Sequence, residues 1–204
     1  MKSLLKIAIT GGPCGGKTSA LSWLKKHFEN SGYQTLFIPE SATELIGGGV
    51  SPRACGRMDY ERCEISLQIA KEKVFEFAAA TIDADSVLIF CDRGVHDNRA
   101  WMSDDEFDLV LAELMTDRNE ILASYDAVFH LVSAAKGAEA SYSLDNNSAR
   151  SETLAEARDL DDRIIAAWHE HPYFVVIDNA GDFEEKMERL IAEVDSFLAT
   201  RIHR

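Results

Sequence analysis

The chain has 204 residues, of which 46% are hydrophobic and 27% are charged, and its formal net charge is −14 at pH 7. This length suits one α/β domain with a full core, and this composition excludes a disordered chain. The negative charge disfavours a nucleic-acid partner, which would need a basic patch or stripe, and no apolar run approaches the roughly 20 residues that span a membrane.

A short apolar strand over residues 4–10 leads into the loop Gly11-Gly-Pro-Cys-Gly-Gly-Lys-Thr18, and a helix follows. A loop of the form G-x-x-x-x-G-K-[ST] between a strand and a helix predicts a phosphate site. Its glycines let backbone N–H groups approach phosphate oxygens, and the helix N-terminus adds positive partial charge. The alternative is a tight strand-to-helix turn with an ordinary lysine.

We therefore predict that this loop binds a nucleoside triphosphate, ATP or GTP, together with Mg²⁺. Lys17 is expected to contact the β- and γ-phosphates, and the Thr18 hydroxyl is expected to ligate the metal ion. The residues predicted to hold the nucleotide here are Gly11, Gly12, Pro13, Cys14, Gly15, Gly16, Lys17, Thr18 and Ser19.

Four further strands are expected along the chain, over residues 34–39, 86–91, 126–132 and 173–177. Strands that alternate with helices predict a parallel sheet with helices on both faces.

The pattern predicts helices from Ser41, over residues 60–83, from a capping box at Ser103, over about 150–169 and from a cap at Asp182. Glycines over 47–56 indicate a loop, and residues 133–149 form a second, polar loop. In the 60–83 helix an apolar stripe recurs at helical spacing: Leu67, Ala70, Val74 and Phe77. On the same helix Gln68 could bind a substrate base or amide, but a lone glutamine on a helix is usually a surface residue.

Polar side chains follow three of the expected strands where each strand ends. Glu40 follows the second strand, Asp92 and Arg93 follow the third, and Asp178 and Asn179 follow the last. In parallel sheets ligands bind beyond the carboxyl ends of the strands. We therefore expect these side chains to line one crevice with the phosphate loop, with the turn at 178–179 beside the nucleotide base.

Asp92 occupies the place where such proteins keep a second acidic group for Mg²⁺. Its alternative role is to cap the segment that follows. Arg93 has a guanidinium fork that suits the oxygens of a transferred phosphoryl group. Its alternative role is a salt bridge to Glu40 or Asp97, and the two roles are compatible.

Glu40 is the candidate general base, because a carboxylate across the crevice from the γ-phosphate could accept the proton of an attacking hydroxyl. A helix cap is the competing interpretation.

Arg150 and Arg158 lie about two turns apart on one expected helix, after a loop rich in Gly, Ser and Asn. This arrangement indicates a lid that brings positive charge over the triphosphate and excludes water. The alternative is a solvated helix face with ion pairs to Glu152, Glu156 or Asp161.

The four cysteines, at positions 14, 55, 63 and 91, form no CxxC pair, and no histidine cluster has metal-ligand spacing. Met1 also leads almost directly into a strand. These features favour reduced thiols in a cytoplasmic protein.

With these residues assembled, the chain resembles the small AAA-type P-loop domain family that includes the nicotinamide-riboside-kinase domain of NadR and a eukaryotic GTP-binding trafficking protein of the Ttd type. The matching N-terminal stretches are Thr10-Gly-Gly-Pro-Cys-Gly-Gly-Lys-Thr18, Ile38-Pro-Glu-Ser-Ala-Thr43 and Asp92-Arg-Gly94 with Asp97. The matching C-terminal block contains His130-Leu131, Gly137-Ala-Glu139, Tyr142, Asn146-Asn147, Arg150, Glu152, Ala157, Leu160-Asp161, Trp168, His171 and Ile177-Asp-Asn179.

This resemblance implies a P-loop NTPase three-layer α/β sandwich with a five-stranded parallel sheet in the order 2-3-1-4-5. It also implies a single kinase-like domain over residues 1–204 with a lid region at about 133–158. More loosely, the layout is similar to deoxynucleoside and nucleoside-monophosphate kinases, in which positions matching Glu40, Asp92-Arg93 and Arg150 hold the base, an acid–arginine pair and a lid arginine. Asp92 is followed by Arg-Gly, where deoxynucleoside kinases have Glu-Arg-Ser.

The leading hypothesis is a Mg²⁺-dependent phosphotransferase that moves the γ-phosphoryl group to a small nucleoside- or riboside-like acceptor. The alternative is a nucleotide-gated regulatory NTPase or GTP-binding protein that acts through protein partners. A Ras-like protein is disfavoured because Leu131-Val-Ser-Ala134 stands where an NKxD motif would follow the fourth strand. A homodimer stays open, since the sequence carries no signal for the oligomeric state.

Overall fold

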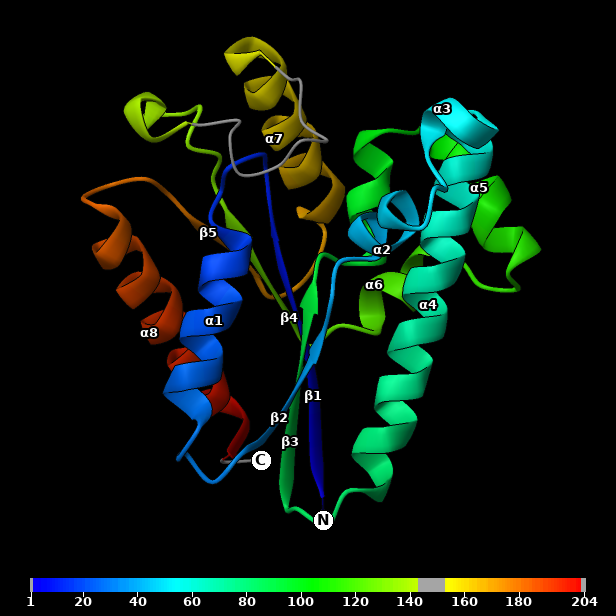
Figure 1. Ribbon diagram of the computed structural model, residues 1–204. Coiled ribbons are helices and arrows are strands. Elements are labelled where there is room, and N and C mark those ends of the chain that lie inside the picture. The colour runs from blue at the N-terminus through cyan, green and yellow to red at the C-terminus, as the bar shows by residue number, and fades with distance from the viewer. Residues whose placement is uncertain (1, 143–152, 203–204) are drawn as a thin grey trace.

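The computed structural model describes residues 2–142 and 153–202 (Figure 1). It contains five parallel strands in the order β2-β3-β1-β4-β5, which confirms the expected topology. The strands are β1 (Ser3–Gly11), β2 (Gln34–Ile38), β3 (Ser86–Asp92), β4 (Ala127–Leu131) and β5 (Phe174–Ile177). Because they are parallel, their carboxyl ends meet at one edge of the sheet.

Helices cover both faces of this sheet, as expected. They are α1 (Lys17–Phe28), α2 (Ser41–Gly47), α3 (Pro52–Cys55), α4 (Arg57–Thr81), α5 (Asp104–Glu113), α6 (Arg118–Ala123), α7 (Leu154–Trp168) and α8 (Phe183–Ile202), with 3-10 turns η1 (Val95–Ala100) and η2 (Glu139–Ser141).

The two faces of the sheet build two separate apolar cores, because successive side chains of a strand point to opposite sides. On one side α1 and α8 pack together, with Leu24 and Phe197 buried against Phe90 and Phe129 of the strands. On the other side α4, α5, α7 and η1 bury a core that includes Trp168. The interior strand β3 contributes to both cores, which explains its continuous apolar sequence.

The helix-capping signals predicted at Ser103 and Asp182 both form capping hydrogen bonds in the structure. Ser103 and Glu106 form the predicted capping box of α5, and Asp182 and Glu185 exchange the same pair of bonds at the start of α8. A third capping box, Thr153 with Glu156, opens α7.

The expected loop over 47–56 is wrong in part, since it contains the short helix α3. The Ser51 side chain accepts from the Ala54 N–H and Pro52 stands in the first turn, and both features start a helix. The sequence analysis also did not identify α6, η1 or η2.

The apolar stripe of the 60–83 helix does not face the core. Val74 and Phe77 on α4 are 64% and 74% exposed, whereas Gln68 and Glu72 are buried. The interpretation of Gln68 as a surface residue is therefore wrong. Among the helices of the described segments, none is long and apolar enough to cross a membrane.

Candidate functional site

The loop after β1 has the backbone of a phosphate site. Gly16 has φ +93° and Cys14 has φ +55°, so the chain passes through left-handed conformations before α1 begins at Lys17. At Gly12 a Cβ atom would lie 2.4 Å from an Asp161 carboxylate oxygen, and at Gly15 it would lie 2.6 Å from the Leu131 carbonyl oxygen. These two positions therefore require glycine for lack of space.

Lys17 is buried under this loop, and its Nζ lies 3.4 Å from the Gly11 carbonyl oxygen. Thr18 and Ser19 are exposed in the first turn of α1. An ammonium group at the loop, beside exposed hydroxyl groups at a helix N-terminus, is the arrangement that the predicted triphosphate site needs.

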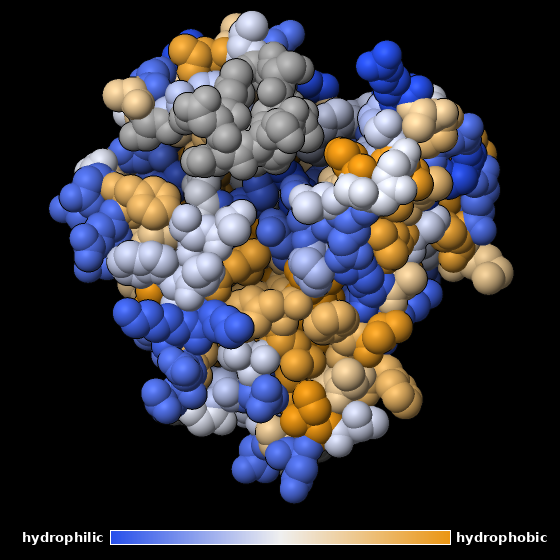
Figure 2. Space-filling model, in the orientation of Figure 1, coloured by the Kyte–Doolittle hydropathy of each residue, from blue (hydrophilic) through white to orange (hydrophobic). Residues whose placement is uncertain are grey.

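Glu40, Arg93 and Asp97 form an ion-pair chain beside the loop. Arg93 Nε donates to Glu40 Oε1 at 2.7 Å, and its Nη1 donates to Asp97 Oδ2 and to the Gly11 carbonyl oxygen, both at 3.2 Å. Thr10 Oγ1 and Trp168 Nε1 fix Asp97 from the other side. Side chains from β1, from η1 and from the residues that follow β2 and β3 therefore meet at one edge of the sheet. Figure 2 shows hydrophilic surface gathered in the upper middle of the molecule, above an apolar region.

The electrostatics of Glu40 follow from this chain. Burial favours its neutral form, but the charges of Arg93 and Lys17 and hydrogen bonds from Thr43 and Arg93 outweigh burial and lower its pKa to about 2. Glu40 stands at the N-cap position of α2, yet its side chain makes no capping bond to the helix backbone. Its oxygens face Arg93 and Thr43 instead, so the cap interpretation does not describe what the side chain does.

Asp92 ends β3 beside Glu40 and Lys17. Its Oδ1 is buried, and within the described part of the chain it has no hydrogen-bond partner. Burial raises the pKa of this carboxyl, while the charge of Lys17 opposes the increase. Gly94, not Asp92, is the N-cap of η1. An unpaired carboxylate oxygen near the loop fits a bound Mg²⁺, which prefers oxygen ligands and retains several waters.

In the described segments no group of three or more His, Cys, Asp and Glu side chains could hold a metal ion. A metal ion at Asp92 and Thr18 would therefore complete its coordination with phosphate oxygens and water.

Asp161 on α7 is a site residue for which the sequence predicted no contact with the phosphate loop. This carboxylate is fully buried, and Oδ1 accepts from the Gly12 and Ser133 N–H groups, both at 3.0 Å. His130 Nε2 lies 3.0 Å from the same oxygen, and Lys136 Nζ lies 2.9 Å from Oδ2. Burial opposes its charge, but these partners lower its pKa to about 2. Asp161 thus anchors the phosphate loop to α7.

A cavity of about 360 Å³ lies beside the loop, on the side of the β5–α8 turn. It is lined by Cys14, Gly15, Ala134, Ala138, Asn179, Gly181, Asp182, Phe183 and Lys186. Its place between the phosphate loop and the expected base turn suits a nucleotide base. The amide group of Asn179 already forms hydrogen bonds within the protein, because its Nδ2 donates to the Ser133 and Lys136 carbonyl oxygens.

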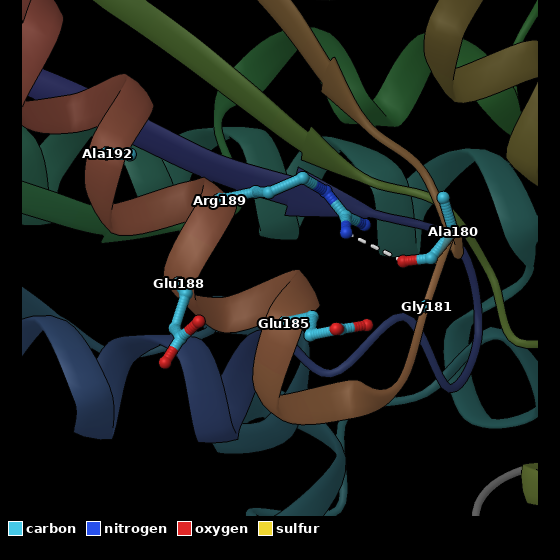
Figure 3. Close-up of a pocket in the computed structure, with 6 residues that line it drawn as sticks. All are labelled: Ala180, Gly181, Glu185, Glu188, Arg189 and Ala192. Atoms are coloured by element: carbon cyan, nitrogen blue, oxygen red, sulfur yellow. Dashed lines mark hydrogen bonds between the residues drawn. The ribbon is translucent and has the colours of Figure 1, made fainter.

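Arg189 supports the same turn from α8. Its guanidinium donates to the carbonyl oxygens of Ala180 and Asp178 at 2.6 and 2.8 Å. Figure 3 shows this side chain reaching from α8 to Ala180, beside a second hollow along the helix. Asp178 itself is exposed and accepts from the Ala180 N–H.

The structure describes one of the two predicted lid residues, Arg158. Arg150 lies outside the described residues. Arg158 donates to the Ala135 carbonyl oxygen at 2.6 Å and to Glu139 at 2.8 Å, so it binds the segment after β4.

Gln68 on α4 belongs to a buried polar network behind the ion-pair chain. Its Oε1 accepts from Ser41 Oγ at 2.7 Å, and its Nε2 donates to Glu72 Oε1 at 2.8 Å and to the Arg93 carbonyl oxygen at 3.5 Å. Glu72 also pairs with Lys6 at 2.8 Å. The network joins the residue after Glu40 to the backbone of Arg93.

None of the curated proteins compared with the chain matches it. The model of a family described as AAA domain matches residues 6–186, which is most of the chain. With the phosphate loop, this match indicates nucleotide binding, usually with Mg²⁺, and the chain belongs to this AAA domain family.

Proposed function

We propose that the protein is a Mg²⁺-dependent phosphotransferase that moves the γ-phosphoryl group of ATP or GTP to a hydroxyl group of a small nucleoside- or riboside-like acceptor. The observation that carries the proposal is Glu40, a carboxylate held beside the phosphate loop by Arg93, which also donates to the loop at Gly11. A phosphotransferase needs such a group to receive the proton of the attacking hydroxyl. The resemblance to the kinase domain of NadR supports the same acceptor class.

The low pKa of Glu40 has to rise for this reaction. A carboxylate with a pKa of about 2 is a weak base, and Arg93 and Lys17 are the charges that lower it. Both cations lie at the loop, where nucleotide phosphates would share their charge. We expect nucleotide binding to weaken the Glu40–Arg93 attraction and so raise the basicity of Glu40 only when substrate is present.

The other residues have separate proposed roles. Lys17 and the loop amides bind the phosphates, while Asp92 and Thr18 hold Mg²⁺, which neutralises charge on the phosphate oxygens. Arg93 stabilises charge on the transferred group, and Arg150 and Arg158 belong to the lid. The segment over 47–56, including α3, borders the acceptor.

The alternative function is a nucleotide-gated regulatory NTPase that acts through protein partners. The Glu40–Arg93 ion pair favours this regulatory function in one respect. A carboxylate with so low a pKa suits a structural salt bridge better than it suits a general base. In that case nucleotide binding would reorder Arg93 and Glu40 without an acceptor.

The test is ATP and GTP turnover with Mg²⁺ against a panel of nucleosides, ribosides and nucleoside monophosphates. A kinase gives turnover that rises sharply with one acceptor. Glu40→Gln should retain nucleotide affinity and lose transfer, whereas Lys17→Ala should lose both. Glu44→Gln is the matched control, since Glu44 lies one helical turn further on and pairs with Lys71 at the surface. Slow turnover that ignores every acceptor contradicts the kinase proposal and favours the regulator.

A further inference from the structure

Lys186 is a buried lysine that the proposed phosphotransfer does not use. It lies in the first turns of α8, and only 4% of the residue is exposed. Its Nζ donates to the carbonyl oxygens of Val132 and Gly15 at 2.7 and 3.0 Å and to Asn179 Oδ1 at 2.7 Å. These acceptors belong to the end of β4, the phosphate loop and the β5–α8 turn, which surround the nucleotide cavity.

The geometry selects the charged form of this amine. An ammonium group has three N–H donors and no acceptor, and here it meets three oxygen acceptors. A neutral amine has two N–H donors and a lone pair, which would face an oxygen. Deprotonation therefore breaks at least one of the three contacts that join the loop to the cavity walls.

The same charge lies directly behind the phosphate loop. Gly15, whose carbonyl oxygen accepts from Lys186, is a loop residue whose neighbouring N–H groups are aimed at phosphate in sites of this type. In a poorly solvated setting a positive charge acts over longer distances than in water. A polyphosphate in the loop would thus interact with Lys186 as well as Lys17.

We propose that Lys186 is a second lysine of the phosphate site, a positioning residue whose ammonium group fixes the loop and adds positive charge beneath bound polyphosphate. The inference rests on the nucleotide binding within the proposed function, but not on phosphotransfer. It predicts that affinity for any polyphosphate falls when Lys186 loses its proton.

Lys186 can lose that proton in an accessible pH range. Burial is the largest influence on its pKa and lowers it to about 8, against the stabilising charges of Asp161 and Asp178. The charged groups that face it from the packed elements are Asp161 of α7, Lys17 of α1, Asp178 and Asp182 of the turn, and Arg189 of α8. A bound polyanion favours the ammonium, so affinity is greatest below this pKa and declines as the pH rises through it.

The experiment measures equilibrium binding of ATP and of inorganic triphosphate, each with Mg²⁺, from about pH 7 to about pH 9.5. We expect affinity for both probes to fall about tenfold across this range. Lys186→Met should bind about tenfold more weakly at pH 7 and lose the pH dependence. Lys25→Met, at an exposed position on α1, is the matched control and should keep the full profile.

A second measurement keeps the proposal testable if Lys186→Met does not fold. Calorimetry of ATP binding to the parent protein, in buffers of different ionisation enthalpy near pH 8, should show net proton uptake. No uptake, a flat profile before substitution, or a pH effect on ATP but not on triphosphate overturns the proposal. If Lys17→Ala and the parent protein both fail to bind either probe, nucleotide binding itself is wrong. If binding behaves as expected but no acceptor is phosphorylated, only the kinase proposal fails.

Discussion

Glu40 and Arg93 lie side by side because the register of the sheet places them there. Ile38 of β2 is paired with Cys91 of β3. Glu40 lies two residues after Ile38 and Arg93 lies two residues after Cys91, and a 2.7 Å hydrogen bond joins them. Arg93 adopts φ +70°, an unusual conformation for a residue other than glycine. Strained backbone of this kind is common at functional sites, and here it aims the guanidinium at Glu40, Asp97 and the phosphate loop.

Arg93→Lys tests the guanidinium fork while retaining the positive charge. Lysine cannot donate to Glu40, Asp97 and Gly11 in the same geometry. We expect acceptor phosphorylation to slow on the order of 10²-fold, with a smaller loss of nucleotide affinity. Steady-state kinetics with the acceptor found in the panel measure both. Arg99→Lys on η1 is the control, and equal kcat in the parent and Arg93→Lys proteins would contradict the role.

The acid stability of the protein should depend on Glu40. Its folded pKa of about 2 lies below the ordinary glutamate pKa of 4.5, so ionised Glu40 stabilises the native state above about pH 4.5. This contribution is lost as the pH falls from about 4.5 towards 2. The free energy of unfolding of Glu40→Gln should be on the order of 2 kcal/mol smaller than that of the parent at pH 7. The two should converge only near pH 2, and a difference that does not depend on pH would be inconsistent with the ion pair.

Asp161→Asn tests the anchor of the phosphate loop. The amide keeps the size of the side chain but removes the charge that accepts from Gly12 and Ser133 and pairs with Lys136. We expect a loss of about 2–4 kcal/mol in the free energy of unfolding and at least about tenfold weaker nucleotide binding. Denaturant titration and equilibrium binding measure these effects. The control is the neighbouring substitution Asp162→Asn, because the Asp162 side chain is 70% exposed. It should change neither the free energy of unfolding nor the nucleotide affinity by much.

The sequence predicts the sheet and the phosphate loop because their signals are local. Consecutive glycines, a lysine and a hydroxyl group define the loop at Gly11–Thr18 without help from distant residues, and the buried apolar run of β3 identifies an interior strand. Strand ends then place Glu40, Asp92 and Arg93 at one edge. That Glu40 and Arg93 meet at this edge therefore follows from topology rather than from any single residue.

The missed site residues have roles that depend on distant partners. Asp161 lies within a helix like any surface aspartate, and only the approach of Gly12 and Ser133 makes it an anchor. Lys186 can be buried because its ammonium group donates hydrogen bonds to three oxygen atoms that are brought together by the fold. On α4 the hydrophobic stripe predicts the helix correctly but the wrong buried face, because buried polar residues share the inner side with apolar ones such as Ile65 and Ala79. Gln68 and Glu72 are buried there, and hydropathy alone assigns such residues to the surface.

Gln68→Leu would show whether this network positions the reacting groups. Leucine is close in volume but leaves Ser41 Oγ, Glu72 and the Arg93 carbonyl oxygen without their amide partner. Because Ser41 follows Glu40 directly, the change should loosen Glu40 and Arg93 relative to the phosphate loop while leaving the loop intact. We expect kcat for acceptor phosphorylation to fall about tenfold or more with little change in the KM for ATP, a split that general destabilisation would not produce. Gln68→Glu should rescue part of the loss through the bond from Ser41, and Gln34→Leu at the exposed start of β2 is the control. An equal loss of kcat and nucleotide affinity in Gln68→Leu would assign the residue to stability alone.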